Sequence, residues 1–145
     1  MNSARILESG KGEGGKELGN SDLTGRIIGA AIEVHRVLGP GFLETIYESA
    51  LCIEMESLGL RVERQKTLPI FYRDRIVGEH RLDLLVEDTV VVELKAVRAI
   101  EPIHYAVVRS YLKAIDRKDA LIINFATSPL TVRRAGRELP TKEIE

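Results

Sequence analysis

The sequence predicts an α/β (α+β) domain in which helices pack on a mixed β-sheet. Two stretches, residues 22–38 and 43–58, repeat apolar residues at helical spacings of three and four. From residue 60 to residue 95 the period changes to two, which is typical of strands. A third helical stretch then precedes a short, wholly apolar run, the pattern of a strand buried on both faces. The predicted order is therefore helix, helix, three antiparallel strands, helix, strand.

The composition fits a single soluble domain. The chain has 145 residues, of which 44% are hydrophobic and 30% charged, and this length suits one domain rather than two. The net charge of -1 gives no general attraction to nucleic acid or membranes, so a polyanion would need a local basic face. The single cysteine, Cys52, excludes an intramolecular disulfide, and its apolar neighbours predict a buried thiol.

The ends of the chain set the limits of this domain. No apolar run reaches the roughly 18 residues that cross a bilayer, and the first residues lack the apolar core of a signal peptide. We therefore expect a cytoplasmic protein without membrane contact. Residues 1–20 interleave five glycines with lysine and glutamate, which predicts a disordered tail or a translation start assigned too early. The folded domain is expected over residues 21–139, followed by a C-terminal tail at 140–145.

The first two helices are expected to form a hairpin. Ser21 or Asp22 can cap the first helix, and Gly39-Pro40-Gly41 ends it after Leu38 because proline cannot continue a helix. The second helix spans about Leu43–Leu58 and ends at the glycine that follows. Its predicted core-facing residues are Ile46, Ala50, Leu51, Met55 and Leu58.

The strands follow from period-two patterns that are bounded by polar turns. The expected sequence is Leu60–Thr67 continuing as Pro69–Tyr72, a turn at Arg73-Asp74-Arg75, a strand at Ile76–Glu87, a connection at Asp88-Thr89, and a strand at Val90–Lys95. Such short connections make successive strands antiparallel neighbours.

The last third of the chain predicts a helix and two strands. Pro102 suits the first turn of a helix. Ala120–Phe125 is predicted to form the buried strand, and Thr131–Arg134 is predicted to form an edge strand. The apolar stripe expected on the helix consists of Ile103, Ala106, Val107, Tyr111, Leu112 and Ile115.

Asp83 and Glu93 are predicted to meet across the hairpin of the second and third strands. Each lies five residues from Asp88, where the turn falls. Antiparallel pairing then places the two residues nearly opposite, with their side-chain bases about 5 Å apart. Leu82 and Leu84, which flank Asp83, are expected to face the other side of the sheet.

Glu93 and Lys95 are two residues apart and share a strand face, while Val92 and Leu94 point into the core. Two adjacent carboxylates repel each other, so one takes up a proton or a cation lies between them. Mg²⁺ or Mn²⁺ suits such oxygen ligands. Near a phosphodiester, Lys95 would orient or activate a water or stabilise developing charge. The alternative is an ordinary charged pair on a solvated strand face.

Glu44 adds an acidic group in the first turn of the second helix. It precedes Tyr47 by three residues, and this spacing places both on one helical face. An acid in this position also stabilises the helix through the helix dipole, which is the alternative explanation for it.

Five sequence blocks stand in order along most of the chain. They run from Leu23 to Glu48, including Gly41-Phe42-Leu43-Glu44-Thr45-Ile46-Tyr47, and continue with Arg81–Val86, Val91–Ala96, Tyr111–Ala114 and Leu121–Phe125. Together they resemble the GxxExxY protein family, which is placed in the PD-(D/E)xK nuclease superfamily. The resemblance implies a restriction-endonuclease-like core, here preceded by an extra N-terminal helix.

The resemblance also implies roles for individual residues. It makes Asp83 and Glu93 metal ligands, assigns Lys95 to catalysis, and completes the acidic cluster with Glu44. Members of the matching blocks are expected to contact the substrate; these are Tyr47, Tyr111 and Arg81. One position departs from the family, because Val107 replaces a glutamine usually found four residues before the tyrosine.

We therefore expect a Mg²⁺- or Mn²⁺-dependent nuclease that hydrolyses phosphodiester bonds in DNA in preference to RNA. The alternatives are a catalytically weak or inactive nuclease-fold module that binds nucleic acid or a protein partner, and a nuclease gated by a partner. The sequence leaves open whether the protein forms a homodimer.

Basic residues and histidines complete the candidates. His35 and His104 lack a metal-ligand spacing, and we expect surface or structural roles for them. Two groups of basic residues form either a face that contacts phosphates or an ordinary solvated face, and the sequence does not decide between these roles. These groups are Arg61, Arg64, Lys66, Arg73 and Arg75, and Arg133, Arg134 and Arg137.

Overall fold

The computed structural model describes residues 18–138, and its elements follow the predicted order. The predicted C-terminal tail at 140–145 and residues 1–17 of the predicted N-terminal tail lie outside the described residues. The elements are α1 (Leu18–Leu38), α2 (Glu44–Ser57), β1 (Val62–Tyr72), β2 (Arg75–Val86), β3 (Val90–Lys95), α3 (Pro102–Ile115), β4 (Asp119–Asn124) and β5 (Thr131–Gly136).

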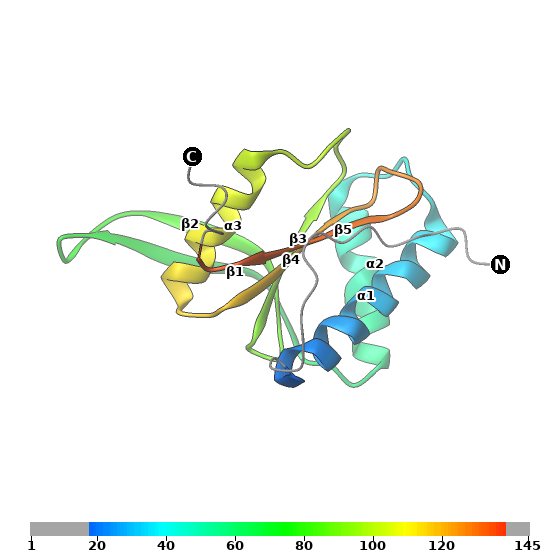
Figure 1. Ribbon diagram of the computed structural model, residues 1–145, viewed down its shortest axis with the longest axis horizontal. Helices are drawn as coiled ribbons and strands as arrows, with labels where there is room; N and C mark the ends of the chain where they lie inside the picture. The colour runs from blue at the N-terminus through cyan, green and yellow to red at the C-terminus, as the bar shows by residue number, and fades with distance from the viewer. Residues whose placement is uncertain (1–17, 139–145) are drawn as a thin grey trace.

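A five-stranded sheet separates the helices into two layers. Its strand order is β1-β2-β3-β4-β5, with β3 and β4 parallel and the other neighbours antiparallel. The α1–α2 hairpin covers one side, and α3, the crossover from β3 to β4, covers the other (Figure 1). Each side has its own apolar core. We call these the α1/α2 cluster and the α3 cluster.

The first helix begins earlier than predicted. It starts at Leu18, so Ser21 and Asp22 lie inside it and do not form its N-terminal cap. The Ser21 carbonyl accepts a hydrogen bond from the Thr24 hydroxyl at 3.1 Å. The end of the helix agrees with the prediction, because Gly39 takes a positive φ of 69° directly after Leu38.

The core-facing side of α2 differs from the prediction. Leu51 and Met55 are buried as expected, but Ile46 is 42% exposed and Leu58 41% exposed. Tyr47 takes the central position instead, with no exposed surface. Its ring stacks on Phe125 of the β4–β5 connection, with ring centroids 4.5 Å apart.

The Tyr47 hydroxyl also fixes the turn that joins α1 to α2. It donates a hydrogen bond to the Gly39 carbonyl and accepts one from the Phe42 N–H at 3.1 Å. A polar group that is buried with an aromatic ring needs such partners to offset its lost hydration. One side chain therefore ties the helical hairpin to the sheet and sets where α2 begins.

The β1–β2 hairpin extends beyond the rest of the sheet. Its two-residue turn, Arg73-Asp74, has positive φ values of 50° and 65°, which match the type I′ turn that suits twisted hairpins. We call its outer part, residues 68–80, the arm (Figure 1). The β2–β3 connection also turns through positive φ, at Glu87 and Asp88, close to where the sequence placed it.

The buried face of α3 is rotated relative to the predicted stripe. Tyr111 and Leu112 are buried as expected, but Ile103 is 60% exposed and Val108 is buried in its place. Cys52 is buried and free, in agreement with the prediction. None of the helices within residues 18–138 has the length and apolar character of a membrane span.

Replacement of Tyr47 by phenylalanine tests the tie between the helical hairpin and the sheet. Tyr47→Phe keeps the stacked ring but removes both hydroxyl hydrogen bonds and leaves the Gly39 carbonyl without its donor. We expect a loss of about 1–3 kcal/mol in the free energy of unfolding, measured by urea denaturation. Tyr72→Phe, at a residue that is 62% exposed, is the matched control. Equal stability of both variants and the parent protein would contradict this role.

Candidate active site

The register of β2 and β3 brings Asp83 opposite Glu93. Their ladder pairs Val86 with Val90 and Leu84 with Val92, and the next step of this register joins Asp83 and Glu93. The regular ladder ends before that step. The two candidate carboxylates therefore lie where the neighbouring strands begin to part.

The Asp83 carboxylate takes the place of a main-chain group at this point. Its Oδ2 accepts a hydrogen bond from the Leu94 N–H at 2.9 Å, a donor that a continued ladder would pair with a carbonyl of β2. Asp83 thus satisfies the backbone of β3 while the strands separate. Burial raises the pKa of Asp83, and the Leu94 hydrogen bond opposes that rise.

Strand β2 also changes the side to which its residues face at Asp83. Leu82 belongs to the α3 cluster, whereas Leu84 belongs to the α1/α2 cluster. Strict alternation predicts the same side for both, so this expectation was wrong. The facing residue Gln65 of β1 has a left-handed backbone with φ of 51°, and it interrupts the pairing between Arg64 and Lys66. The distortion of both strands accounts for the change of side.

Glu93 is a buried acid with an incomplete set of partners. It is 6% exposed, and its Oε1 is buried without a hydrogen-bond partner. Its Oε2 lies 3.7 Å from the Lys95 Nζ. Burial, followed by the charge of Asp83, raises the pKa of Glu93 to about 8, although Lys95 acts in the opposite direction. The predicted pairing of Glu93 with Lys95 on one face is therefore observed, but in a buried setting rather than on a solvated face.

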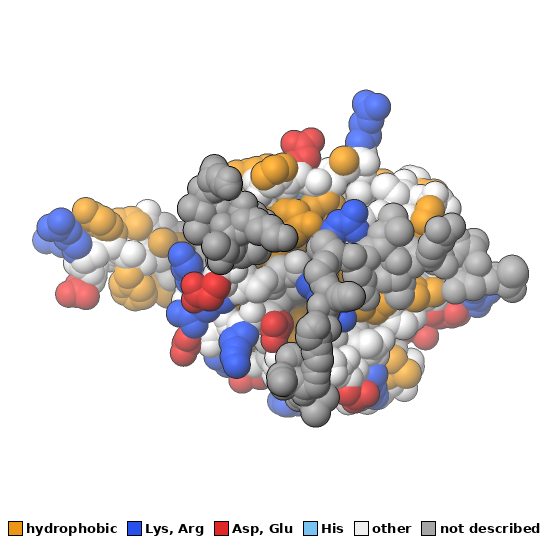
Figure 2. All heavy atoms as spheres, in the orientation of Figure 1, with side chains coloured by type: hydrophobic (Ala, Val, Ile, Leu, Met, Phe, Trp, Pro, Cys, Tyr) orange, Lys and Arg blue, Asp and Glu red, His pale blue; other side chains and the backbone are white. Residues whose placement is uncertain are grey.

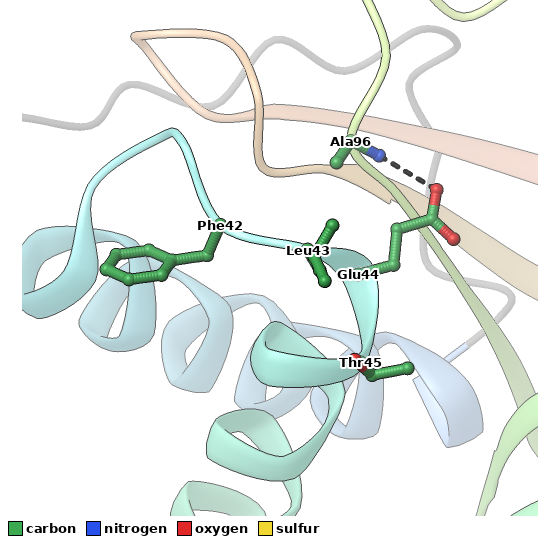
Figure 3. A pocket seen from close by; sticks show the side chains of 5 residues that line it. All are labelled: Phe42, Leu43, Glu44, Thr45 and Ala96. Atoms are coloured by element: carbon green, nitrogen blue, oxygen red, sulfur yellow. Dashed lines mark hydrogen bonds between the residues drawn. The ribbon is translucent and has the colours of Figure 1, made fainter.

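Glu44 approaches the end of β3 from the first turn of α2. Its Oε2 accepts a hydrogen bond from the Ala96 N–H at 3.1 Å (Figure 3). The carboxylate borders an open hollow of about 440 Å³, which is lined by Phe42, Leu43, Glu44, Thr45 and Ala96. Glu44 thus joins the helical layer to the point where β3 leaves the sheet, and we call Glu44, Asp83 and Glu93 the acidic cluster.

Glu48 is an acid of this region that the sequence reasoning missed. It follows Glu44 by one helical turn and is 5% exposed. Its carboxylate accepts hydrogen bonds from Arg64 Nε at 3.1 Å and Gln65 Nε2 at 2.9 Å. Its charge contributes to the raised pKa of Asp83, after burial. The spacing of four from Glu44 is visible in the sequence, but a glutamate is seldom buried unless it is paired, so the spacing alone does not indicate burial.

The three predicted substrate-contacting residues lie in different settings. Tyr47 is fully buried in the α1/α2 cluster. Tyr111 is 8% exposed on α3, and its pKa is raised to about 12 by burial and then by the charges of Glu93 and Asp83. Arg81 is exposed on β2, where its backbone pairs with Thr67. Of the three, Tyr111 is the one whose pKa responds to the charges of Glu93 and Asp83.

The remaining candidates have structural contacts. His35 is 2% exposed, and its Nε2 lies 2.8 Å from the Thr127 carbonyl. His104 accepts a hydrogen bond from the Glu101 N–H in a capping box at the start of α3. Basic residues of the two predicted clusters form ion pairs: Arg61 with Glu87, Arg64 with Glu48, Lys66 with Glu63, and Arg137 with Asp116.

The acidic cluster offers carboxylate oxygens, the kind of ligand that divalent cations prefer, but they are not arranged as a formed cation site. Within residues 18–138, no three His, Cys, Asp or Glu side chains are arranged as ligands of one ion. Each carboxylate instead has a partner within the protein. Asp83 accepts a hydrogen bond from the Leu94 N–H, Glu93 forms an ion pair with Lys95, and Glu44 accepts a hydrogen bond from the Ala96 N–H. The orphaned Glu93 Oε1 nevertheless lacks such a donor, and carboxylate oxygens are the ligands that Mg²⁺ and Mn²⁺ prefer.

Comparison with known proteins agrees with this geometry. The sequence profile of the PD-(D/E)XK nuclease superfamily matches residues 21–135, and the chain belongs to this superfamily. Nucleases of this superfamily generally use divalent metal ions and act on nucleic acid. Among curated protein sequences, none is significantly similar to the chain.

A solved structure supports the fold. The crystal structure of SSO0001 is similar to this chain with a TM-score of 0.51 and 12% sequence identity, over 89% of this chain. The chain spans 65% of the length of that protein. The predicted restriction-endonuclease-like fold is confirmed by the superfamily match and this likeness together.

The buried acid predicts an unusual dependence of stability on pH. The pKa of Glu93 is about 8 in the folded chain and 4.5 as its ordinary value. Between these pH values the folded chain holds a proton that the unfolded chain has lost, so the free energy of unfolding falls as pH rises. Glu93→Gln cannot ionise and escapes this loss. In EDTA at pH 8.5 we expect its Tm to exceed that of the parent protein by on the order of 10 °C.

The difference in Tm should disappear below pH 4.5, where the unfolded chain is also protonated. Glu79→Gln, at an exposed position of β2, controls for the loss of one negative charge. A parallel pH dependence of Glu93→Gln and the parent protein would contradict the buried, proton-holding state of Glu93.

Proposed function

We propose that the protein is a metal-dependent nuclease of the GxxExxY subfamily, acting on DNA in preference to RNA with Mg²⁺ or Mn²⁺. The observation that carries this proposal is the buried Glu93 carboxylate, which is next to Asp83, beside Lys95 and without a partner at Oε1. Residues 21–139 form the nuclease domain in this proposal. The superfamily match supplies the reaction class, and the acidic cluster supplies the chemistry.

The acidic cluster would hold the ion. Glu93 provides an oxygen without a competing hydrogen bond, while Asp83 and Glu44 provide oxygens that each accept one main-chain N–H. When bound, the ion supplies Lewis acidity at the scissile phosphate and lowers the pKa of a nearby water. A bound cation would oppose the burial and the charge of Asp83 that raise the pKa of Glu93, because a cation favours the charged form of a carboxyl.

Lys95 acts from the same face as Glu93. Its Nζ lies 3.7 Å from Glu93 Oε2, and its side chain is 21% exposed. The ammonium group can therefore reach both the cluster and a bound phosphodiester, where it orients the attacking water and stabilises charge on the phosphate. Tyr111 closes the site on the α3 side, and its raised pKa of about 12 keeps its hydroxyl a neutral hydrogen-bond donor.

A binding module without turnover is the second candidate. Val107 is half-buried and packs against the α3 cluster. The glutamine expected there from the family resemblance would add an amide one helical turn before Tyr111. Without that amide, the carboxylates of the acidic cluster remain available to bind an ion, but the site lacks one group that could orient water or phosphate.

Cleavage assays test the first candidate. The purified protein should cleave labelled DNA when Mg²⁺ or Mn²⁺ is present and should be inactive in EDTA. Glu93→Gln and Lys95→Ala should each lower the rate by on the order of 100-fold or more. Glu56→Gln, an exposed acid at the far end of α2, should cleave as the parent protein does. Cleavage that persists in both site variants would refute the proposed site.

Restoration of the missing amide separates the two candidates. Val107→Gln should raise the cleavage rate by about tenfold if the amide helps to orient water or phosphate. Ile103→Gln introduces the same side chain at an exposed position of α3 and should have no effect. Salt-dependent DNA binding without cleavage, in the parent protein and in Val107→Gln alike, would favour the binding module.

A further inference from the structure

A second hollow lies between the arm and α3. It has a volume of about 460 Å³, within the range of small-ligand pockets. The arm provides one wall, and the second half of α3 provides the other. The lining residues are Leu68, Pro69, Ile70 and Phe71 of β1, His80 of β2, and Ser110, Lys113 and Ala114 of α3.

The lining combines an aromatic ring with hydrogen-bonding groups and one cation. Phe71 is 59% exposed although it borders the hollow. His80 and Ser110 form a hydrogen bond of 3.1 Å with each other. The Ser110 hydroxyl also donates to the Val107 carbonyl at 2.6 Å, so it can offer a ligand only an acceptor, whereas His80 has a second ring nitrogen. Lys113 is exposed at the rim, and the lining contains no carboxylate.

Two aromatic residues, His80 and Tyr111, connect the hollow to the region of the candidate active site. The ring of His80 contacts that of Tyr111 edge-on, with centroids 4.8 Å apart. Tyr111 in turn packs in the α3 cluster with Leu82, which directly precedes Asp83, and with Val91, which is two residues before Glu93 on the same strand. One aromatic pair thus separates the hollow from the acidic cluster. A nucleic-acid strand with one phosphodiester at the acidic cluster can therefore place a neighbouring nucleotide in the hollow.

We propose that this hollow binds an unpaired nucleobase of a single-stranded nucleic acid next to the cleaved bond. The proposal rests on the proposed nuclease function and specifies the class of substrate. Phe71 stacks on the base, His80 and Ser110 contact its edge, and Lys113 pairs with the adjoining phosphate.

The chemistry of the lining favours this occupant. Aromatic rings with flanking cations are the usual means of binding single strands, because each base has a face for stacking and each unit has a phosphate. Bases within a duplex are already stacked and paired, so they cannot enter without being extruded. Hydrophobic side chains follow the arm, and charged side chains of both signs lie at its tip (Figure 2). The turn there is Arg73-Asp74, and Arg75 follows it. The apolar and basic side chains of the arm can therefore extend the contact along the nucleic-acid strand.

Gly78 provides a way to fill the hollow. It pairs with Ile70, one of the lining residues. A Cβ placed at Gly78 meets nothing within 4 Å, so a larger side chain enters open space without a clash. Gly78→Leu should then occupy the room that the base needs while the fold is kept.

The test is binding of a fluorescein-labelled oligothymidine, followed by fluorescence anisotropy in EDTA so that no cleavage intervenes. The parent protein should bind this strand more tightly than a duplex of equal length. Phe71→Ala should weaken binding roughly 5- to 150-fold, the typical loss of one stacked base, and Gly78→Leu should weaken it at least as much. Lys113→Ala should reduce the slope of log affinity against log salt by about 0.7, as expected for one lost phosphate contact.

Matched controls lie outside the hollow. Ile53→Ala removes an exposed apolar side chain on α2, and Lys118→Ala an exposed cation after α3; both should bind as the parent protein does. The proposal is overturned if Phe71→Ala and Gly78→Leu bind normally, if a duplex binds more tightly than the single strand, or if the parent protein binds neither. It is also overturned if Phe71→Ala changes the molar mass in light scattering, which would make the hollow a contact between copies of the chain.

This experiment separates the binding proposal from the nuclease proposal. Weakened binding by the hollow variants, together with no cleavage by the parent protein, would support the base site and refute the nuclease. Cleavage that depends on Glu93, together with unchanged binding by Phe71→Ala, would support the nuclease and refute the base site.

Discussion

The parting of β2 from β3 at Asp83 is the constraint on which the site depends. A regular ladder would pair the Leu94 N–H with a main-chain carbonyl of β2. The Asp83 carboxylate accepts that N–H instead, so the strands separate without leaving a buried donor unpaired. The change of side between Leu82 and Leu84 occurs at the same residue. One side chain therefore allows both the opening of the sheet and the redirection of the arm.

The same arrangement buries the carboxyl groups of Asp83 and Glu93 away from water. Glu93 and Asp83 have raised pKa values because burial penalises their ionised forms. Buried carboxyl groups of this kind lower the stability of the protein when they ionise. The surrounding core offsets this loss: Tyr47 anchors α2 on Phe125, and that helix carries Glu44 to the end of β3. Within the Gly41–Tyr47 block, Tyr47 thus fixes the position of α2, and Glu44 depends on that position for its contact with β3.

Local patterns in the sequence were sufficient for the element order and for the meeting of Asp83 with Glu93, because turn position alone determines hairpin register. They were insufficient where tertiary contacts override periodicity. Tyr47 enters the core in preference to Ile46 because the ring finds both a stacking partner and two hydrogen bonds. Glu48 is buried because Arg64 and Gln65, which follow in the next element, satisfy its carboxylate. Gln65 itself takes a left-handed backbone that no residue preference predicted.

Pro69 has a consequence for the behaviour of the protein at high concentration. β1 forms one edge of the sheet, and its outer part carries the exposed side chains of Phe71 and Tyr72. A long apolar edge of this kind can recruit strands from other molecules and begin aggregation. Proline has no N–H to offer an incoming strand, and the irregular pairing between Ile70 and Phe71 disrupts the edge further. The arm can thus expose the side chains that a ligand needs while its backbone resists self-association.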